Sequence, residues 1–216
     1  MRAIIFDLDG VLVHTDQFHY LAWKRLADQM GVYFDEAINN RLRGVSRMDS
    51  LDIVLERADR VFSPEEKERL AAEKNETYRT LLATMTPEDV PGSVRATLTE
   101  LRRRGCRLAI GSSSKNTKFI LERVGLTSYF DAISDGTNIS RSKPDPEVFL
   151  KAAEFLGEDP VQCAVIEDAF AGIDAAKAAG MWAVGIGDAA NYERADAHIQ
   201  TLSELLELFP ERRTEQ

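Results

Sequence analysis

Acidic side chains that could carry out phosphoryl chemistry stand near the start of the chain. Asp7 and Asp9 follow the apolar run Ala3–Phe6 and precede Gly10. Residues two apart in a strand point to the same side, so these carboxylates would repel each other unless a cation lay between them. One can then act as a nucleophile and the other as a proton donor and acceptor, the pairing that covalent phosphoryl transfer needs. Solvated turn residues would also give this spacing, but the preceding apolar strand favours the functional interpretation.

Three further clusters follow later in the chain. The segment Ser112–Asn116 opens a predicted helix and offers hydroxyls, backbone N–H groups and a lysine to a phosphate. Lys143 comes just before a helix start at Pro146. Glu167-Asp168 offers hard oxygen ligands that, together with Asp7, suit Mg²⁺. A serine helix cap, a surface lysine and an acidic turn would explain these clusters singly, whereas their recurrence at successive strand ends favours one functional site.

Short apolar runs must position these clusters. They are typical of buried parallel strands and lie at Ala3–Phe6, Arg107–Ile110, Cys163–Ile166 and Trp182–Ile186. The helical stretches among them each end at a glycine that suits a left-handed C-terminal cap: Val94–Arg104, Lys115–Val124 and Ala169–Ala179. This alternation predicts a doubly wound, Rossmann-like α/β core, in which ligands bind beyond the carboxyl ends of the strands.

Residues 14–86 do not follow the alternation and are helical almost throughout by pattern. One predicted helix face carries Phe18, Leu21, Ala22, Leu26 and Met30. Ser63–Glu66 is a capping box with proline at the first helical position, and residues 85–92 form a return linker. The sequence therefore predicts a catalytic α/β core of residues 1–13 and 87–216 and an inserted helical domain of residues 14–86.

Composition limits the possible partners. The chain has 216 residues, of which 44% are hydrophobic and 29% charged, a balance typical of a folded globular protein. Its net charge of -9 argues against nucleic-acid binding, which needs a basic surface. No apolar run reaches about 18 residues and the first residues do not resemble a signal peptide, so we expect a cytoplasmic protein without membrane contact. We also expect a monomer, and buried free thiols at Cys106 and Cys163.

The four clusters resemble the motifs of the haloacid dehalogenase superfamily. Phe6–Gly10 (FDLDG) is similar to its first motif, Gly111-Ser112-Ser113 to its second, Lys143 to its third and Ile166–Ala169 (IEDA) to its fourth. The resemblance covers essentially the whole core. The helical insert is similar to the cap of the first subclass of that superfamily.

Within the superfamily the chain resembles the β-phosphoglucomutase branch, through Phe18–Trp23, Leu42–Ser50, Glu73–Asn75 and Ser114–Asn116. The resemblance implies the following substrate-binding residues: Thr15, His19, Trp23, Leu42, Gly44, Val45, Ser46, Arg47, Ser50, Lys74, Ser113, Ser114, Lys115 and Asn116. Core packing would equally explain Trp23 and Leu42, and a solvated position would explain Arg47. His14 departs from the family, which commonly has an acidic residue there, and we expect this difference to affect the packing or charge of the hinge rather than the chemical step.

The resemblance implies a Mg²⁺-dependent phosphomutase that interconverts β-glucose 1-phosphate and glucose 6-phosphate through an aspartyl-phosphate and β-glucose 1,6-bisphosphate. Asp7 would be the nucleophile and Asp9 the acid and base, while Ser112 and Lys143 would neutralise the phosphoryl group. One Mg²⁺ would be held by Asp7, the Asp9 carbonyl, Glu167 and Asp168. A sugar-phosphate phosphatase is the nearer alternative. A catalytically silent binding or regulatory module is disfavoured because the acidic residues are intact.

Overall fold

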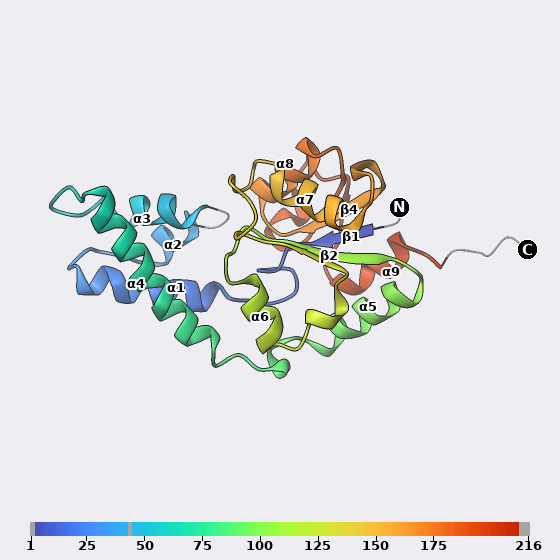
Figure 1. Ribbon diagram of the computed structural model, residues 1–216, viewed down its shortest axis with the longest axis horizontal. Coiled ribbons are helices and arrows are strands. Elements are labelled where there is room, and N and C mark those ends of the chain that lie inside the picture. The colour runs from blue at the N-terminus through green and yellow to red at the C-terminus, as the bar shows by residue number, and fades with distance from the viewer. Residues whose placement is uncertain (1–2, 43–44, 212–216) are drawn as a thin grey trace, which may run out of the picture. The chain divides into compact units, whose positions relative to one another are not determined.

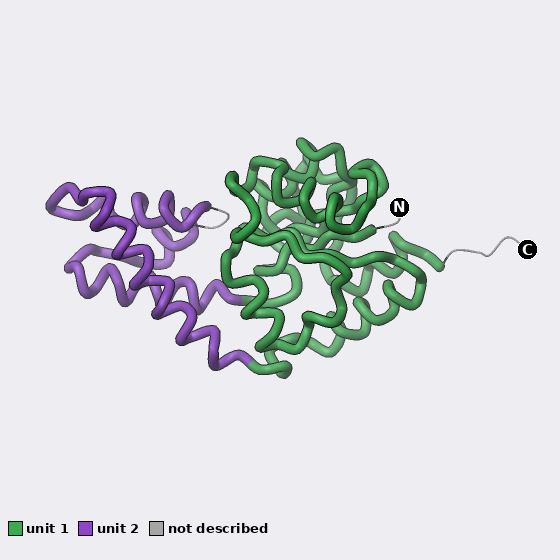
Figure 2. The backbone as a smooth tube through the Cα atoms, in the orientation of Figure 1, with its two compact units in different colours: residues 1–14, 86–216 green, residues 15–85 purple. Residues whose placement is uncertain are grey.

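The computed structural model describes residues 3–42 and 45–211 of the chain (Figure 1). The chain divides into two compact units (Figure 2). One, here called the α/β unit, comprises Met1–His14 and Thr86–Gln216. The other, here called the helical unit, comprises Thr15–Met85. Among the described residues, no helix has the length and apolar character needed to span a membrane.

The α/β unit is built on a six-stranded parallel sheet with the order β3-β2-β1-β4-β5-β6. Its strands are β1 (Ala3–Phe6), β2 (Arg107–Gly111), β3 (Ala132–Ser134), β4 (Cys163–Glu167), β5 (Trp182–Gly185) and β6 (Ala197–His198). Phe6 of β1 lies opposite Ile110 of β2 and Ile166 of β4. The residues that follow these three strands therefore meet at one edge of the sheet.

Helices cover both faces of this sheet (Figure 1). They are α5 (Gly92–Arg103), α6 (Thr117–Arg123), α7 (Glu147–Leu156), α8 (Phe170–Ala178) and α9 (Leu205–Leu208), with short 3₁₀ turns at Pro87–Asp89, Thr127–Tyr129, Pro160–Gln162, Gly187–Asn191 and Leu202–Glu204. Phe149 of α7 and Ile173 of α8 pack with Ile5 and Val165 in one fully buried cluster. The expected doubly wound α/β fold is thus confirmed.

Local details of this unit both match and correct the sequence interpretation. Gly105, Gly125 and Gly180 have φ angles of 78°, 65° and 72°, the left-handed caps that the pattern predicted. Strands β3 and β6 were not predicted, because they have three and two residues and too little apolar pattern to be recognised. Cys163 is buried as expected, whereas Cys106 is half-buried.

The helix predicted from Lys115 begins two residues later, at Thr117. The Ser112 hydroxyl accepts a hydrogen bond from Ser114 N–H and the Ser114 hydroxyl accepts one from Asn116 N–H, both at 3.2 Å. Serine side chains that bind the local backbone in this way compete with helical hydrogen bonds. Ser112–Asn116 is therefore a loop between β2 and α6 rather than the first turn of a helix.

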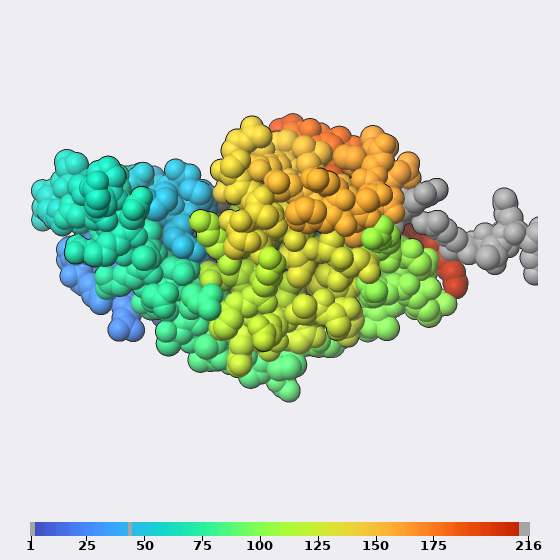
Figure 3. All heavy atoms as spheres, in the orientation of Figure 1, coloured from blue at the N-terminus to red at the C-terminus, as the bar shows by residue number. Residues whose placement is uncertain are grey.

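The helical unit contains α1 (Asp16–Gln29), α2 (Glu36–Asn40), α3 (Arg47–Leu55) and α4 (Pro64–Leu82). Its core includes Trp23, Leu26, Leu51 and Leu70. The space-filling view shows α1, in blue, in direct contact with the green-cyan α4 (Figure 3). The buried face of α1 is Ala22, Trp23, Leu26 and Ala27.

The inclusion of Leu21 in that face was wrong, because Leu21 is 40% exposed. At about 100° per residue, a face centred between Trp23 and Leu26 leaves Leu21 on the opposite side of the helix.

The capping box at the start of α4 is present as predicted. The Ser63 hydroxyl accepts from Glu66 N–H at 3.3 Å, and the Glu66 carboxylate accepts from Ser63 N–H at 2.9 Å. Two backbone N–H groups that the helix cannot satisfy internally thus gain partners.

Replacing Ser63 by Ala is expected to lower the free energy of unfolding of the helical unit by about 1 kcal/mol, the usual value of an N-cap hydroxyl. Urea titration followed by circular dichroism measures the change. Ser63→Asp keeps an acceptor at the cap and is expected to stay near the wild-type value. Equal losses in both variants would show that the cap is not the source of the stability.

Candidate active site

Strand β1 delivers Asp7 to the carboxyl edge of the sheet. Its N–H donates to the Ile166 carbonyl at 2.9 Å, which extends the pairing with β4 one residue beyond the strand. The chain then turns at Gly10, whose φ of 83° is left-handed and whose N–H donates to the Val13 carbonyl at 2.7 Å. Asp7 is 7% exposed, so its carboxylate is largely shielded from solvent at this edge of the sheet.

Lys143 supplies the positive charge beside Asp7. Its buried ammonium donates to Asp7 Oδ1 at 2.5 Å and to Glu167 Oε2 at 2.8 Å, and lies 4.7 Å from the centre of the Phe149 ring. Burial opposes the charged form, but the two carboxylates outweigh it and raise the pKa of Lys143 above its usual value. The lysine is therefore a fixed cation, which rules out the surface position that the sequence left open.

Three carboxylates converge at this point: Asp7, Glu167 and Asp168 each offer an oxygen within 4.8 Å of the others. Burial raises the pKa of Glu167 to about 7, with the charge of Asp7 adding to the shift and Lys143 opposing it. Burial and the charges of Glu167 and Asp7 raise the pKa of Asp168 to about 8. Excess negative charge on hard oxygen atoms is the environment that a divalent cation such as Mg²⁺ stabilises.

Two glycines leave the space that these carboxylates occupy. A Cβ on Gly10 would lie 2.0 Å from Asp168 Oδ2, and a Cβ on Gly172 would lie 2.0 Å from Glu167 Cδ. Any other residue would force the carboxylates to move. The two glycines thus leave room for the Asp168 and Glu167 carboxylates, and the three carboxylates together suit a magnesium ion.

Asp9 lies close to the cluster without joining it. Its charge contributes to the raised pKa of Asp168, but its carboxylate is outside the group of three described above. A carboxylate beside such an acidic cluster has the chemistry to give and to take a proton.

The Ser112–Asn116 loop follows β2 at the same edge. Ser112 is 2% exposed, and Ser113 Oγ lies 3.5 Å from the N–H of Lys143. Asn116 is buried and Lys115 is exposed. The four predicted clusters, represented by Asp7, Ser112, Lys143 and Glu167, therefore lie along one edge of the α/β unit.

A second group of charged and aromatic side chains lies within the helical unit. Lys74 Nζ is 3.0 Å from His19 Nδ1 and 4.6 Å from the ring centres of both Trp23 and Tyr78. Burial, followed by the positive charges of Lys74 and Arg47, holds the pKa of His19 well below its usual range. The imidazole is therefore neutral and accepts a hydrogen bond from the ammonium.

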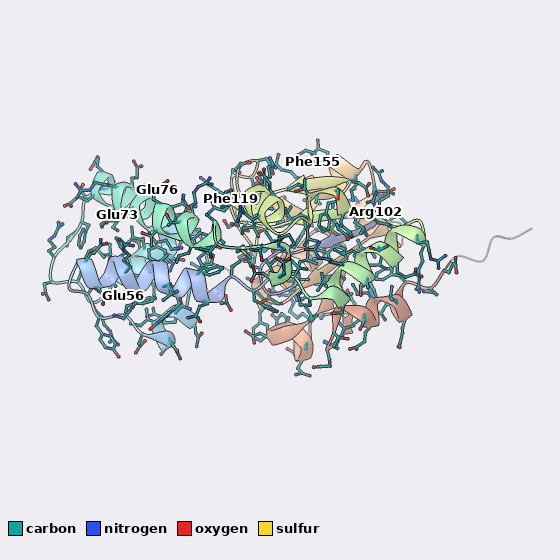
Figure 4. The ribbon with its side chains drawn as sticks, turned by 90° about the horizontal axis from the view of Figure 1, so that it is seen from below. Glu56, Glu73, Glu76, Arg102, Phe119 and Phe155 are labelled. Carbon is teal, nitrogen blue, oxygen red and sulfur yellow. The ribbon has the colours of Figure 1, made fainter. Side chains whose placement is uncertain are left out.

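Tyr78 was not predicted from the sequence, although its ring lies 4.0 Å from that of His19. Its position four residues after Lys74 on α4 is the signal that could have indicated it, because such residues share a helix face. Glu73, by contrast, points outward from α4 together with Glu76 (Figure 4).

Other predicted residues of the helical unit have structural roles or solvent positions. Leu42 belongs to the core with Trp23, as the alternative interpretation held. The Ser46 hydroxyl caps α3 by accepting from Asp49 N–H at 3.2 Å. Thr15 and Ser50 are buried and Val45 is exposed. Gly44 lies outside the described residues.

A parallel sheet that ends in this cluster of carboxylates and one buried lysine defines an α/β enzyme with a charged site at its carboxyl edge. The chain belongs to the haloacid dehalogenase-like hydrolase family, which it matches over residues 1–180. This confirms the superfamily expected from the four motifs.

Individual relatives include both mutases and phosphatases. The chain is 42% identical over 214 residues to a β-phosphoglucomutase of Bacillus subtilis, covering 98% of this chain and 95% of the relative. It is 33% identical to a fructose-1-phosphate phosphatase of Escherichia coli, covering 85% and 95%. The crystal structure of a β-phosphoglucomutase from Clostridium difficile superposes with a TM-score of 0.88 at 39% identity, covering 95% and 93%. The resemblance to the β-phosphoglucomutase branch is thereby confirmed.

Adding a methyl group at position 172 is expected to displace the Glu167 carboxylate and weaken Mg²⁺ binding about tenfold, the effect typical of disturbing groups around a metal site. Isothermal titration of Gly172→Ala with Mg²⁺ measures this. Gly92→Ala is the matched control, since Gly92 opens α5 and a Cβ there meets nothing within 4 Å. Wild-type affinity in Gly172→Ala would show that Glu167 is not part of the metal site.

Proposed function

We propose that the chain is a Mg²⁺-dependent phosphomutase that interconverts β-glucose 1-phosphate and glucose 6-phosphate. The observation that carries the proposal is the presence of two separate charged groups. Asp7, Lys143 and the acidic pair form one, in the α/β unit, and His19, Lys74 and Arg47 form the other, in the helical unit. A mutase handles a substrate with two phosphates and needs a separate site for each. The relative at 42% identity supports the same activity.

In this proposal the α/β unit is the catalytic domain and the helical unit is its cap. Asp7 attacks the phosphorus of the bisphosphate and forms an aspartyl-phosphate, while Asp9 gives a proton to the departing sugar oxygen. Lys143 and Ser112 neutralise the oxygens of the transferring phosphoryl group. A Mg²⁺ ion bound by Asp7, the Asp9 carbonyl and Asp168, with Glu167 completing or orienting its shell, would add further charge neutralisation.

The second half of the reaction returns the phosphoryl group to the sugar. Asp9 takes the proton from the attacking hydroxyl of β-glucose 1-phosphate, and Asp7 gives up its phosphoryl group to make β-glucose 1,6-bisphosphate. That intermediate turns around and donates its other phosphate to Asp7, which releases glucose 6-phosphate. We assign the phosphate that is not being transferred to Arg47, whose planar guanidinium suits it, and to Ser114, Lys115 and Asn116.

A sugar-phosphate phosphatase is the second candidate, because relatives at 33% and 34% identity carry that activity in their names. The two functions differ only in the acceptor of the phosphoryl group, a sugar hydroxyl or water. One reaction with β-glucose 1-phosphate, Mg²⁺ and a trace of the bisphosphate distinguishes them. Glucose 6-phosphate in large excess over free phosphate supports the mutase, and the reverse ratio supports the phosphatase. We further infer that the protein acts as a cytoplasmic monomer on small sugar phosphates.

Asp7→Asn is expected to abolish turnover with the fold intact, because an amide has nearly the same size but is a poor nucleophile and a weaker metal ligand. The coupled assay for glucose 6-phosphate measures turnover and circular dichroism measures the fold. Substantial residual activity, with mass spectrometry excluding deamidation back to Asp, would contradict a covalent role for Asp7.

Arg47→Ala is expected to lower the mutase kcat/KM at least tenfold, because hydrogen bonds to charged groups are worth about 1.5–3 kcal/mol each. Phosphorylation of Asp7 by acetyl phosphate should be nearly unchanged, since that donor has no second phosphate. Arg57→Ala is the matched control, because Arg57 is exposed over the Tyr33 ring. If the ratio of glucose 6-phosphate to free phosphate did not fall in Arg47→Ala, Arg47 would be a solvated residue and the phosphatase would become the better assignment.

A further inference from the structure

A turn that the mechanism does not use packs against the phosphate-binding loop. The turn is Ser134–Asn138, which begins at the last residue of β3, and the loop is Ser112–Asn116, which follows the neighbouring strand β2. The Ser134 carbonyl accepts from Ser112 N–H, and Gly136 N–H donates to the Ser114 carbonyl, both at 3.1 Å. Two backbone hydrogen bonds therefore join the turn to the loop.

Gly136 allows the turn to approach the loop closely. A Cβ at this position would lie 2.3 Å from the Ser113 carbonyl oxygen and 2.9 Å from Lys115 N. Both atoms belong to the backbone, which cannot rotate away as a side chain would. A shift of the turn is therefore transmitted to Ser113 and Lys115 directly.

Asp135 holds this turn together from inside the protein, with an exposed fraction of 0%. Its Oδ1 accepts from Thr137 N–H at 2.8 Å and from the Thr137 hydroxyl at 2.5 Å. With its amide oriented to satisfy both of its polar groups, Asn138 donates to the Asp135 carbonyl at 3.1 Å and accepts from Asp135 N–H at 3.3 Å. The carboxylate and the amide thus fix the backbone of the turn.

The other carboxylate oxygen of Asp135 faces the far end of the loop. Among the described residues Oδ2 has no hydrogen-bond partner, and the ammonium of Lys118 lies 3.7 Å away. Lys118 is in the first turn of α6, directly after the loop. A buried carboxylate oxygen without a hydrogen bond is costly, and the nearby ammonium of Lys118 offsets part of that cost. Asp135 therefore acts on both ends of the loop.

We propose that Asp135 is a positioning residue that, through Gly136 and Lys118, fixes the Ser112–Asn116 loop for the phosphate that is not being transferred. This inference rests on the proposed function, in which that loop binds the second phosphate. A small displacement of groups that orient a substrate has large effects on rate and affinity. Asp135 is expected to control the use of sugar phosphates and to leave the chemistry at Asp7 unaffected.

Two variants and one control test the proposal. Asp135→Asn keeps the size of the side chain and the acceptor for Thr137 but removes the charge. Lys118→Met removes the same attraction. Because the Lys118 side chain is 63% exposed, we expect this variant to fold normally. Asp131→Asn is the control. Asp131 precedes β3, accepts from Leu108 N–H at 2.9 Å and pairs with Arg102, and so supports the opposite end of the same strand.

Each protein is assayed for mutase KM and kcat, for phosphorylation by acetyl phosphate, and for thermal unfolding. We expect Asp135→Asn and Lys118→Met each to raise KM for β-glucose 1-phosphate about tenfold, in line with the loss of one charge-assisted contact. Acetyl phosphate should phosphorylate both variants at the wild-type rate. The double variant should show little further loss, because the two changes remove one interaction. Asp131→Asn should lower the melting temperature without raising KM.

Equal losses with both phosphoryl donors, or an unchanged KM in both variants, would overturn the proposal. So would an equal rise of KM in Asp131→Asn, which would indicate general loosening of β3. The wild-type protein tests the proposed function separately. If it hydrolyses sugar phosphates instead of isomerising them, the proposed function fails, and the same comparison of KM values for sugar phosphate and acetyl phosphate still tests Asp135.

Discussion

One buried ammonium in contact with two buried carboxylates holds the charged edge of the sheet together. Lys143 brings its positive charge to Asp7, which follows β1, and to Glu167, which is the last residue of β4. Without the lysine, these two negative charges would lie together in a buried region. Breaking such a buried pair costs about 3–5 kcal/mol because a charge is left uncompensated. The surrounding core is shaped to hold the lysine. Because Gly111 has no side chain, the Phe149 ring can approach it closely: a Cβ on Gly111 would lie only 2.6 Å from Phe149 Cδ1. The centre of that ring lies 4.7 Å from the Lys143 ammonium.

The charged group of the α/β unit and that of the helical unit differ in the sign of their charge. The lysine compensates part of the negative charge of Asp7, Glu167 and Asp168, and the remaining excess favours a divalent cation. In the helical unit the signs are reversed, since the positive charges of Lys74 and Arg47 both lower the pKa of a neutral His19. In the proposed function, the acidic group serves the metal-assisted phosphoryl transfer and the basic group serves a second phosphate on the substrate. This division is the physical basis for preferring a mutase to an enzyme that handles one phosphate.

The sequence could predict those parts of the molecule that depend on local pattern. Apolar runs located β1, β2, β4 and β5. Each run is followed by a polar residue or a glycine, as expected where a buried strand ends. The Lys143 contact with Glu167 and the Tyr78 ring beside His19 could not be predicted, because they depend on how distant segments pack. The face of α1 was misjudged at Leu21, which lies on the side of the helix opposite the face centred between Trp23 and Leu26. Gly136 and Gly172 gave no local signal at all, since their importance lies in what their missing side chains would have met.

The most direct test of the central claim is to locate the phosphoryl group on the protein itself. The protein is incubated with acetyl phosphate and Mg²⁺, the acyl phosphate is reduced with borohydride to homoserine, and peptides are sequenced by mass spectrometry. We expect homoserine at position 7, in the peptide that contains Phe6–Gly10. Labelling at another carboxylate, or no labelling while sugar phosphate is still turned over, would contradict a site in which Lys143 and the acidic pair serve Asp7 as the nucleophile.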